Sequence, residues 1–282
     1  MSIRSRVPEV HAGIALHYAA HEVPAETTFA DFHISVERPA GPRRWIRPQV
    51  LFAFDGHRPF TPLPGDQGFP MLEWGMNWCL SSHFHRYLIL HAAVIERGGR
   101  ALILPAPPGS GKSTLCAGLV WRGWRLLSDE LTLIDPESGQ VAAGARPVSL
   151  KNASIDVIRH FAPQAVFGPV VHETTKGSVA HFRPPLGAVQ RADETALPAW
   201  VVLPRYVAGA QTCLQPLPRG RALMRLIENA FNYHVHGMQG FHALARLMDG
   251  CESYEFSYSR LDEAVDVFER LALSPPAAGC AG

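Results

Sequence analysis

The chain has 282 residues, and 26 Lys and Arg stand against 25 Asp and Glu, so its formal net charge is only +1. Apolar residues make up 47% and charged residues 18%, as in ordinary globular proteins. This balance argues against a nucleic-acid partner, and no run of about 18 apolar residues predicts a membrane span. Five scattered cysteines without metal-ligand spacing are typical of reduced thiols, so we expect a cytoplasmic protein that binds neither nucleic acid nor membrane.

The first part of the chain is expected to be rich in β-structure. Apolar and polar residues alternate over residues 29–37 and again over 50–54, as in half-buried strands. A proline-rich stretch over residues 59–70 then predicts a linker. We therefore predict three parts: a small β-rich N-terminal subdomain (1–70), a larger domain (71–273) and a flexible tail (274–282).

A helix and then a hairpin are predicted to follow the linker. Apolar residues recur at helical spacing over residues 71–79, and we interpret this stripe as core rather than as a cofactor site. Residues 87–96 read as a strand, Gly98 and Gly99 as a turn, and residues 101–104 as a second strand. In common parallel-sheet nucleotide-binding folds this last strand is reached through a crossover connection. Here it is expected to be the second strand of an antiparallel hairpin, which reduces the number of folds that fit the sequence.

Residues 106–113 read Ala-Pro-Pro-Gly-Ser-Gly-Lys-Ser and match the phosphate-binding (Walker A) pattern, with Ala106 where glycine usually stands. The strand before the loop and a helix-like run over residues 114–120 let backbone N–H groups and a helix N-terminus converge on one anion. Lys112 is expected to reach the β- and γ-phosphates, and the Ser113 hydroxyl to hold Mg²⁺. The predicted phosphate cradle is Pro108, Gly109, Ser110, Gly111, Lys112, Ser113 and Thr114.

Several absent motifs narrow the nucleotide and the class of protein. An Asn-Lys-x-Asp motif would mark a guanine-specific site, and the sequence has none, so ATP with Mg²⁺ is the expected cofactor. The signature of transporter ATPases and the His-Arg-Asp and Asp-Phe-Gly motifs of eukaryotic-type protein kinases are also absent.

Residues 124–130 are predicted to form a short strand that ends in two carboxylates, Asp129 and Glu130. Asp129 can bind Mg²⁺ together with Ser113, or accept a proton from an attacking hydroxyl. A surface turn is the alternative for both acids. His91, on the strand that pairs with the phosphate-loop strand, is a candidate for acid–base chemistry or a satisfied core histidine.

Phosphoryl transfer also needs positive charge on the γ-phosphate besides Lys112 and Mg²⁺. Lys151, Lys176 and Arg183 are the candidates, because they fall within residues 146–195, a stretch of weak periodicity that we interpret as active-site loops. Each of the three can equally be a solvated surface charge.

The C-terminal part is predicted to return to regular structure. Ser259 and Asp262 form a capping-box signal for the last helix. In chain order we expect strands over 200–203 and 212–217, helices over 219–231 and 238–248, a strand over 254–258 and a final helix from residue 261.

Three segments resemble bacterial HPr kinase/phosphorylase at closely similar spacings. They are residues 91–96 (His-Ala-Ala-Val-Ile-Glu), the phosphate loop, and residues 122–130 (Arg-Gly-Trp-Arg-Leu-Leu-Ser-Asp-Glu). The whole chain looks closer still to the HPr-kinase-related kinase A family, in residues 69–75, 146–152 and 229–233. Glu130 replaces a second Asp, and the Glu-x-Arg-Gly-x-Gly signature of the reverse reaction is absent, so neither phosphorylase activity nor HPr as substrate is implied.

The resemblance implies a fold like that of phosphoenolpyruvate carboxykinase: an α/β architecture with a P-loop mixed sheet and helices, which makes residues 71–273 a P-loop kinase domain. It implies transfer of a phosphoryl group from Mg-ATP to a hydroxyl, of the serine-kinase type, on a peptide or protein acceptor. It makes Asp129 the base or metal carboxylate, Glu130 the second acid and His91 the histidine of the site. It also implies homo-oligomers and a peptide-modification pathway, with a small peptide-binding protein encoded nearby as a partner.

Three functions stay open at this point. A Mg-ATP-dependent kinase would use Asp129 to activate the acceptor hydroxyl, and Lys112 with Lys151 or Lys176 to stabilise the transferring group. An ATP-bound scaffold would recruit a peptide partner through the N-terminal region without turnover, and an ATPase switch would couple hydrolysis to a conformational change. The spacing of Asp129 favours the kinase.

Overall fold

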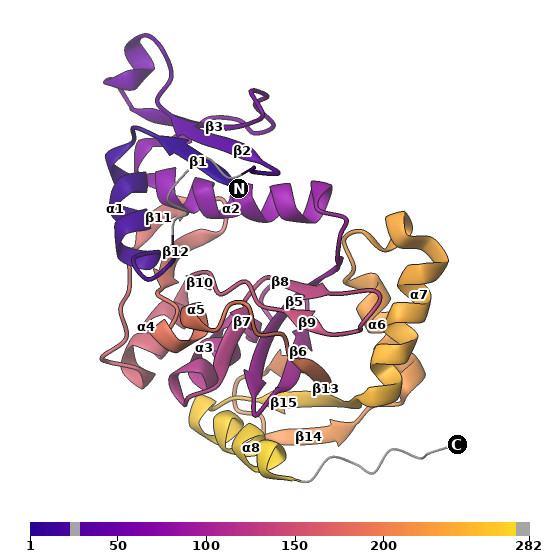
Figure 1. Cartoon of the computed structure of the whole chain (residues 1–282). Helices are drawn as coiled ribbons and strands as arrows, with labels where there is room; N and C mark the ends of the chain where they lie inside the picture. The colour runs from indigo at the N-terminus through magenta and orange to yellow at the C-terminus, as the bar shows by residue number, and fades with distance from the viewer. Residues whose placement is uncertain (23–28, 275–282) are drawn as a thin grey trace.

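The computed structural model describes residues 1–22 and 29–274. Figure 1 labels the helices and strands. In chain order they are β1 (Ser2–Ser5), α1 (Pro8–His17), β2 (His33–Glu37), the 3-10 helix η1 (Pro42–Arg44), β3 (Gln49–Phe54), β4 (Leu63–Pro64), the 3-10 helix η2 (Gly65–Gln67), α2 (Gly68–His83), β5 (Leu88–Arg97), β6 (Arg100–Pro105), α3 (Lys112–Trp121), β7 (Arg125–Ser128), β8 (Leu131–Ile134), β9 (Val141–Ala142), β10 (Val148–Lys151), α4 (Ala153–Phe161), β11 (Val171–Thr174), β12 (Gly177–Phe182), α5 (Leu186–Gln190), β13 (Leu197–Tyr206), β14 (Cys213–Pro216), α6 (Arg219–Glu228), α7 (Tyr233–Gly250), β15 (Glu252–Tyr258) and α8 (Leu261–Leu273).

A mixed sheet of eight strands forms the centre of the molecule. Its order is β14-β15-β13-β6-β5-β8-β9. β8 pairs with the first half of β5, and β7 pairs with the second half of the same strand. The predicted hairpin is confirmed, since β5 and β6 pair antiparallel around Gly98 and Gly99, both of which have positive φ. Strands β6, β13 and β15 are parallel neighbours, so their carboxyl ends meet at one edge of the sheet.

Helices cover both faces of this sheet. Apolar side chains of β5 and β6 alternate between two cores: Ile95 and Leu102 face the side of α3, α4 and α8, whereas Val94 and Ile103 face the side of α6 and α7. Burial on both faces explains why β5 reads as a continuous apolar run rather than an alternating one.

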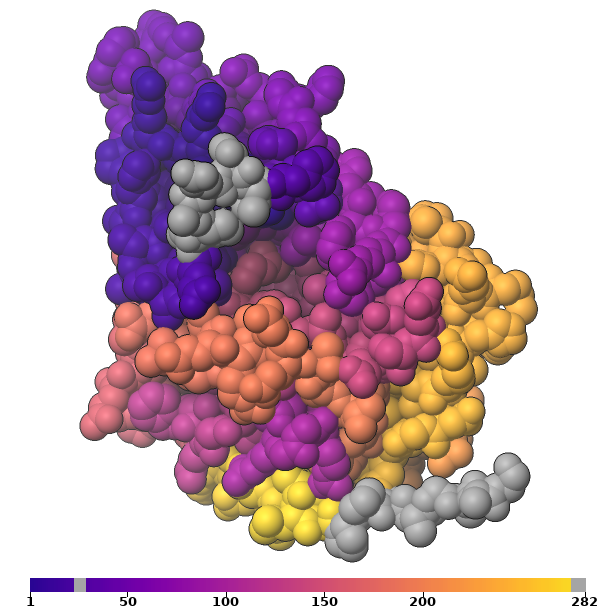
Figure 2. All heavy atoms as spheres, in the orientation of Figure 1, coloured from indigo at the N-terminus to yellow at the C-terminus, as the bar shows by residue number. Residues whose placement is uncertain are grey.

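A separate N-terminal layer packs around its own core. Strands β1 to β4 form a four-stranded sheet, and the expected inward faces of β2 and β3 are confirmed by the burial of Ile34 and Phe52. The linker predicted over residues 59–70 is wrong, because α2 begins at Gly68 and packs Met71, Leu72 and Cys79 on this sheet. The predicted boundary at residue 70 thus falls inside α2. Figure 2 shows the N-terminal segments, indigo to purple, gathered at one end of the molecule.

The first helix of this layer, α1, was not predicted. Its apolar residues do not form a helical stripe, and the structure buries only Val10, Gly13 and His17. Gly13 is needed because a Cβ at this position would collide with the ring of Phe69 in α2. Contact between α1 and α2 therefore depends on a small residue, which periodicity does not reveal.

The irregular loops predicted over residues 146–195 are wrong. This segment forms a third sheet of order β10-β12-β11, together with α4 and α5. Its strands have only four to six residues, so the alternation that identifies a strand in a sequence has little length in which to appear. Both edge strands of this small sheet pair with β12.

The C-terminal elements agree with the predicted order but differ at their ends. Helix α7 begins five residues earlier than predicted, across a kink at Gly237. The predicted capping box is wrong, because Arg260 is the N-cap residue of α8 and the Ser259 hydroxyl donates instead to the Ala210 carbonyl oxygen at 2.7 Å. Of the tail predicted over 274–282, only Ser274 belongs to the described residues.

Two further expectations concern the described residues as a whole. Four cysteines in this part of the chain are free thiols, namely Cys79, Cys116, Cys213 and Cys251. Within residues 1–22 and 29–274, the helices are too short or too polar to cross a membrane.

Candidate functional site

The loop between β6 and α3 has the backbone geometry that an anion site requires. Gly109 and Gly111 both have positive φ, and Gly111 is the N-cap residue of α3. The Leu115 N–H donates to the Gly111 carbonyl oxygen at 2.9 Å, which leaves the N–H groups of the preceding first-turn residues free of helical bonds. The loop therefore presents the free donors and the positive end of a helix at one place.

Two tyrosines that the sequence did not reveal complete this edge of the sheet. Tyr206 ends β13 and Tyr258 ends β15, beside the loop that follows β6. The Tyr258 hydroxyl donates to the Gly111 carbonyl oxygen at 2.9 Å, and a Cβ on Gly111 would collide with it. Both tyrosines could have been proposed from their place at the ends of predicted strands, since ligands bind at the carboxyl ends of parallel strands.

A pocket of about 400 Å³ opens at this edge, and the residues of the 107–114 loop form one wall. Two buried polar atoms of the loop, Lys112 Nζ and Ser110 Oγ, have no hydrogen-bond partner among the described residues. A buried ammonium without a partner is costly unless a ligand supplies the opposite charge. The pocket thus fits an anionic group of several atoms, such as the triphosphate of a nucleoside triphosphate.

The two predicted carboxylates lie next to this pocket in different environments. Asp129 is buried, and its Oδ2 accepts a hydrogen bond from the Ser149 N–H at 3.1 Å, whereas its Oδ1 has no partner in the described chain. Glu130 lines the large pocket and pairs with Lys151 at 3.4 Å. Asp129 therefore has one fixed oxygen and one free oxygen.

The environment separates the proton affinities of the two acids. Burial, and next the charge of Glu130, raise the pKa of Asp129 to about 6, although Lys112 and Lys151 oppose the change. Burial also acts to raise the pKa of Glu130, but Lys151, Lys112 and Lys176 outweigh it and lower that pKa. Neighbouring acids with pKa values moved apart are typical of a pair in which one acts as the base and the other stays charged.

The predicted cationic residues fall into three different places. Lys151 lines the large pocket from the end of β10. Lys176, in the turn between β11 and β12, does not line it; its Nζ lies 4.9 Å from the ring centre of Trp74. Arg183 is exposed and lines neither this pocket nor the smaller one described below.

His91 lines the large pocket from β5. Burial, and then the charge of Lys112, lower the pKa of His91 to about 4, so the ring is neutral at pH 7. Its ring packs against Phe231 at 5.7 Å between centroids. A neutral imidazole beside an anion site can exchange a proton or donate a hydrogen bond, and it adds no charge.

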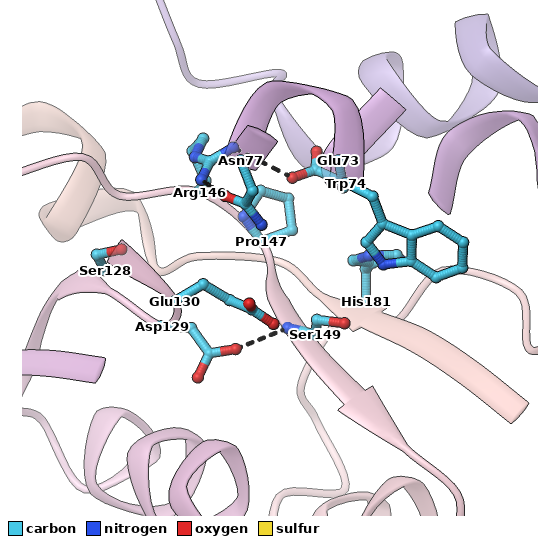
Figure 3. Close-up of a pocket in the computed structure, with 10 residues that line it drawn as sticks. All are labelled: Glu73, Trp74, Asn77, Ser128, Asp129, Glu130, Arg146, Pro147, Ser149 and His181. Carbon is cyan, nitrogen blue, oxygen red and sulfur yellow. Dashed lines mark hydrogen bonds and ion pairs between the residues drawn. The ribbon is translucent and has the colours of Figure 1, made fainter. Parts of the chain in front are cut away.

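A second pocket lies on the other side of Glu130 and Ser149, which line both pockets. Its volume of about 10 Å³ has room for one water molecule. Figure 3 shows Glu73, Trp74 and Asn77 on α2, with Asn77 next to Arg146 and the Trp74 indole beside His181. The sequence did not identify this pocket, and its interpretation of the Trp74 stripe as core did not anticipate a tryptophan at a cavity.

The small pocket is lined by buried polar atoms that lack hydrogen-bond partners within the described residues. The residues of this pocket that carry such an atom are Trp74 (Nε1), Asp129 (Oδ1), Arg146 (Nη1), Ser149 (Oγ) and His181 (Nε2). Burial lowers the pKa of His181 to about 3, so this ring too is neutral. A buried polar atom is normally satisfied by protein or water, so five such atoms on residues that line one cavity indicate a polar occupant.

A hydrogen-bonded network joins α2 to the segment before β10. Glu73 accepts a hydrogen bond from the Tyr18 hydroxyl at 2.6 Å and pairs with Arg146 at 3.8 Å, while Arg146 also donates to Asn77. Burial raises the pKa of Glu73, and Arg146 opposes this change. The network therefore ties α2, which carries Trp74, to the segment that leads into β10.

A metal would depend on ligands from outside the protein. No group of three or more His, Cys, Asp or Glu side chains in the described chain is placed to hold an ion by itself. Ser113 lines the large pocket and Asp129 the small one. A Mg²⁺ ion near them would take most of its ligands from phosphate oxygens and water, which is its usual preference.

The fold and the site define a mixed α/β protein in which a glycine-bearing loop and helix N-terminus lie beside a buried carboxylate. No protein-family model matches the chain, and no curated protein matches it. Among solved structures it is similar to the Hpr(Ser) kinase/phosphatase from Coxiella burnetii, with 13% sequence identity and a TM-score of 0.28. The similarity covers 65% of this chain and 96% of that chain. The chemistry is therefore argued from the site itself.

Proposed function

We propose that this protein is an ATP-dependent kinase that transfers the γ-phosphoryl group of Mg-ATP to a hydroxyl of a peptide or protein acceptor, with serine as the acceptor residue. One observation carries the proposal: Lys112 Nζ and Asp129 Oδ1 are both buried and unpartnered within the described residues, and their pockets share the wall formed by Glu130 and Ser149. A cation for the phosphates and a base for the hydroxyl are the two groups that phosphoryl transfer needs.

In the proposed reaction, the acceptor hydroxyl gives its proton to Asp129 Oδ1 as its oxygen bonds to the γ-phosphorus. The bond from the γ-phosphorus to the bridging oxygen breaks, and ADP leaves with that electron pair. Lys112 and Lys151 stabilise the charge on the phosphoryl oxygens. The raised pKa of Asp129 suits a base, because the carboxylate is charged at pH 7 and still has affinity for a proton.

Magnesium, when bound, would neutralise charge on the β- and γ-phosphate oxygens. We propose Ser113 and Asp129 as the protein groups that hold it, in keeping with the hydroxyl and carboxylate oxygens that Mg²⁺ prefers. Glu130 keeps its charge through Lys151 and orients that lysine at the phosphate pocket. The proposed surroundings of the reaction, a cytoplasmic peptide-modification pathway with a peptide-binding partner and a homo-oligomeric kinase, rest on the sequence resemblance alone.

The test is transfer of label from γ-labelled ATP to an acceptor in a lysate, with purified wild-type protein and Asp129→Asn side by side. We expect an acid-stable phosphoester with the wild type and a loss of about 10²- to 10⁴-fold in the variant, because the amide cannot take the proton. ATP affinity should change little. Equal transfer by both proteins would contradict the assignment of Asp129.

A second readout separates the base role of Asp129 from its metal role. If Asp129 mainly holds the ion, the Mg²⁺ concentration for half-maximal ATP binding rises in Asp129→Asn. If the residue mainly takes the proton, that concentration stays the same while transfer is lost. An acid-labile label would instead point to a nitrogen acceptor and contradict the serine assignment.

A further inference from the structure

The large pocket extends across the phosphate loop to a side of the sheet that the proposed reaction does not use. In the sheet order, β6, which leads into the loop, lies between β13 and β5. His91 belongs to β5, while Asp129 and Glu130 follow β7, which pairs with β5. Tyr206 and Tyr258 end β13 and β15 on the other side of β6. The groups of the proposed chemistry and the two tyrosines therefore flank the loop from opposite sides.

Tyr206 is fixed against the phosphate loop. Its N–H donates to the Ser110 carbonyl oxygen at 2.8 Å, and a Cβ built on Gly111 would lie 3.0 Å from its own Cβ. The ring of Tyr258 meets the Tyr206 ring at 5.8 Å between centroids and 74° between planes. The Tyr258 hydroxyl in turn donates to the Gly111 carbonyl oxygen at 2.9 Å. Several contacts thus set the position of Tyr206 relative to the loop.

The Tyr206 side chain still has free surface. Tyr206 lines the large pocket and is 51% exposed. Tyr258 beside it is buried, and its ring is stacked on Phe256. An exposed aromatic ring in a pocket can stack on a flat ligand group, and every nucleobase has a π-face.

The direction of the triphosphate decides on which side the base lies. In the proposed reaction the γ-phosphate meets Asp129, and Lys112 contacts the β- and γ-phosphates at the loop. The α-phosphate and the nucleoside then extend away from the acids, toward β13 and β15. Leu261, at the start of α8, lines the pocket shortly after β15 and adds an apolar side chain. Val157 also lines the pocket, but it is aliphatic and belongs to α4, which continues from the strand of Lys151.

Building on the proposed kinase function, we propose that Tyr206 is the base-stacking residue of the nucleotide site, and that its ring packs on the purine of ATP. The phosphate loop and this ring then hold the two ends of one ligand. The backbone bond from Tyr206 to Ser110 keeps the loop and the ring together. Because Tyr206 acts on the base and Lys112 acts on the phosphates, their effects on binding are separable.

The experiment compares two ligands with three linked phosphates, ATP and inorganic tripolyphosphate, at the same Mg²⁺ concentration. Calorimetry gives the Kd of each ligand for the wild type and the variants. We expect Tyr206→Ala to weaken ATP binding by about tenfold, because a base–aromatic stack is lost, and to leave tripolyphosphate binding unchanged. Tyr206→Phe keeps the ring and should bind ATP as the wild type does. The matched control, Tyr254→Ala, should change neither Kd, since Tyr254 is a partly buried residue of β15 that lines neither pocket.

Equal weakening of both ligands in Tyr206→Ala would overturn the proposal, because the residue would then act on the phosphate loop. Unchanged affinity for both ligands would overturn it as well. Failure of the proposed function has a different result. If the wild type binds ATP with the expected Tyr206 dependence but transfers no phosphoryl group, the kinase function is wrong and the base site stands. If the wild type binds neither ligand, both proposals are wrong.

A second measurement detects the stacking directly and does not depend on the folding of Tyr206→Ala. The probe is etheno-ATP, an ATP analogue whose fluorescent base loses emission when it stacks on an aromatic ring. We expect the wild type and Tyr206→Phe to quench the bound probe. Tyr206→Leu, which keeps apolar volume without a ring face, should quench it less. Equal emission of the probe bound to Tyr206→Phe and to Tyr206→Leu would overturn the stacking assignment.

Discussion

The two pockets share a wall but differ in how the chain builds them. One wall of the large pocket is the continuous segment 107–114, which joins a hairpin strand to the helix that follows it. The small pocket collects its side chains from α2, the Asp129 loop, β10 and β12, which are more than 100 residues apart at their extremes. One pocket is thus a local structure, and the other exists only after the two layers have packed together.

The pockets also differ in the charge that each leaves without a partner. Lys112 offers a positive charge at the large pocket, and Asp129 offers a negative one at the small pocket. Glu130 lines both pockets, and Lys151, which pairs with it, lines the large one. This difference indicates a division of labour, in which one side holds an anion and the other takes a proton.

The largest expected effect comes from the large pocket. Lys112→Ala removes the unpartnered ammonium, and we expect transfer at fixed ATP to fall by about 10³-fold. ATP affinity should weaken as well, because in the proposed complex the lysine would contact the phosphates before and during transfer. Calorimetric ATP binding together with the transfer assay checks both values. Unchanged binding would show that the nucleotide lies elsewhere.

Two lysines allow a sharper comparison between the pockets. Lys151→Met removes a charge that lines the large pocket and should slow transfer by about 30-fold, while Lys176→Met removes a charge that lies on the Trp74 ring outside it. We expect the second variant to lose less than fivefold, as is usual for the loss of an exposed cation–π contact. Rates at saturating ATP decide between them. A larger loss in Lys176→Met would mean that this lysine reaches the phosphate when the site is loaded.

A change of pH, without any substitution, should also separate the two sides of the site. The pKa of Asp129 is raised to about 6, so below pH 6 its base form is lost, and kcat/KM for ATP should fall about tenfold per pH unit. ATP binding should persist over the same range, because protonation of Asp129 removes a negative charge near the phosphates. The pH profiles of rate and of the Kd for ATP check this. A Kd for ATP that rises in parallel with the fall in rate would contradict the proposed separation of anion binding from proton transfer.

The features that the sequence predicted well are those that depend on near neighbours. The hairpin rests on an apolar run and two glycines with positive φ, and the loop rests on one octapeptide followed by a helix. The position of Asp129 after a buried strand is likewise a local matter. Long apolar strands and turn glycines keep their meaning in any tertiary context.

The features that the sequence missed depend on distant contacts. Helix α1 carries no clear stripe and is recognised only from its packing on α2 through Gly13. The strands of the small sheet are too short to show alternation. Lys151 and Lys176 looked equivalent as candidates, and only their placement relative to the pockets separates them.

By itself the sequence determined the strand, loop and helix that prepare an anion site, because backbone conformation there follows from glycines, prolines and local hydrogen bonds. Tertiary structure alone decided that Trp74 of the N-terminal layer lines the same small cavity as Asp129, and that burial gives this acid a raised pKa. The shared cavity and the raised pKa both depend on which surfaces pack together and exclude water. That exclusion is a property of the packed layers, and no local segment contains it.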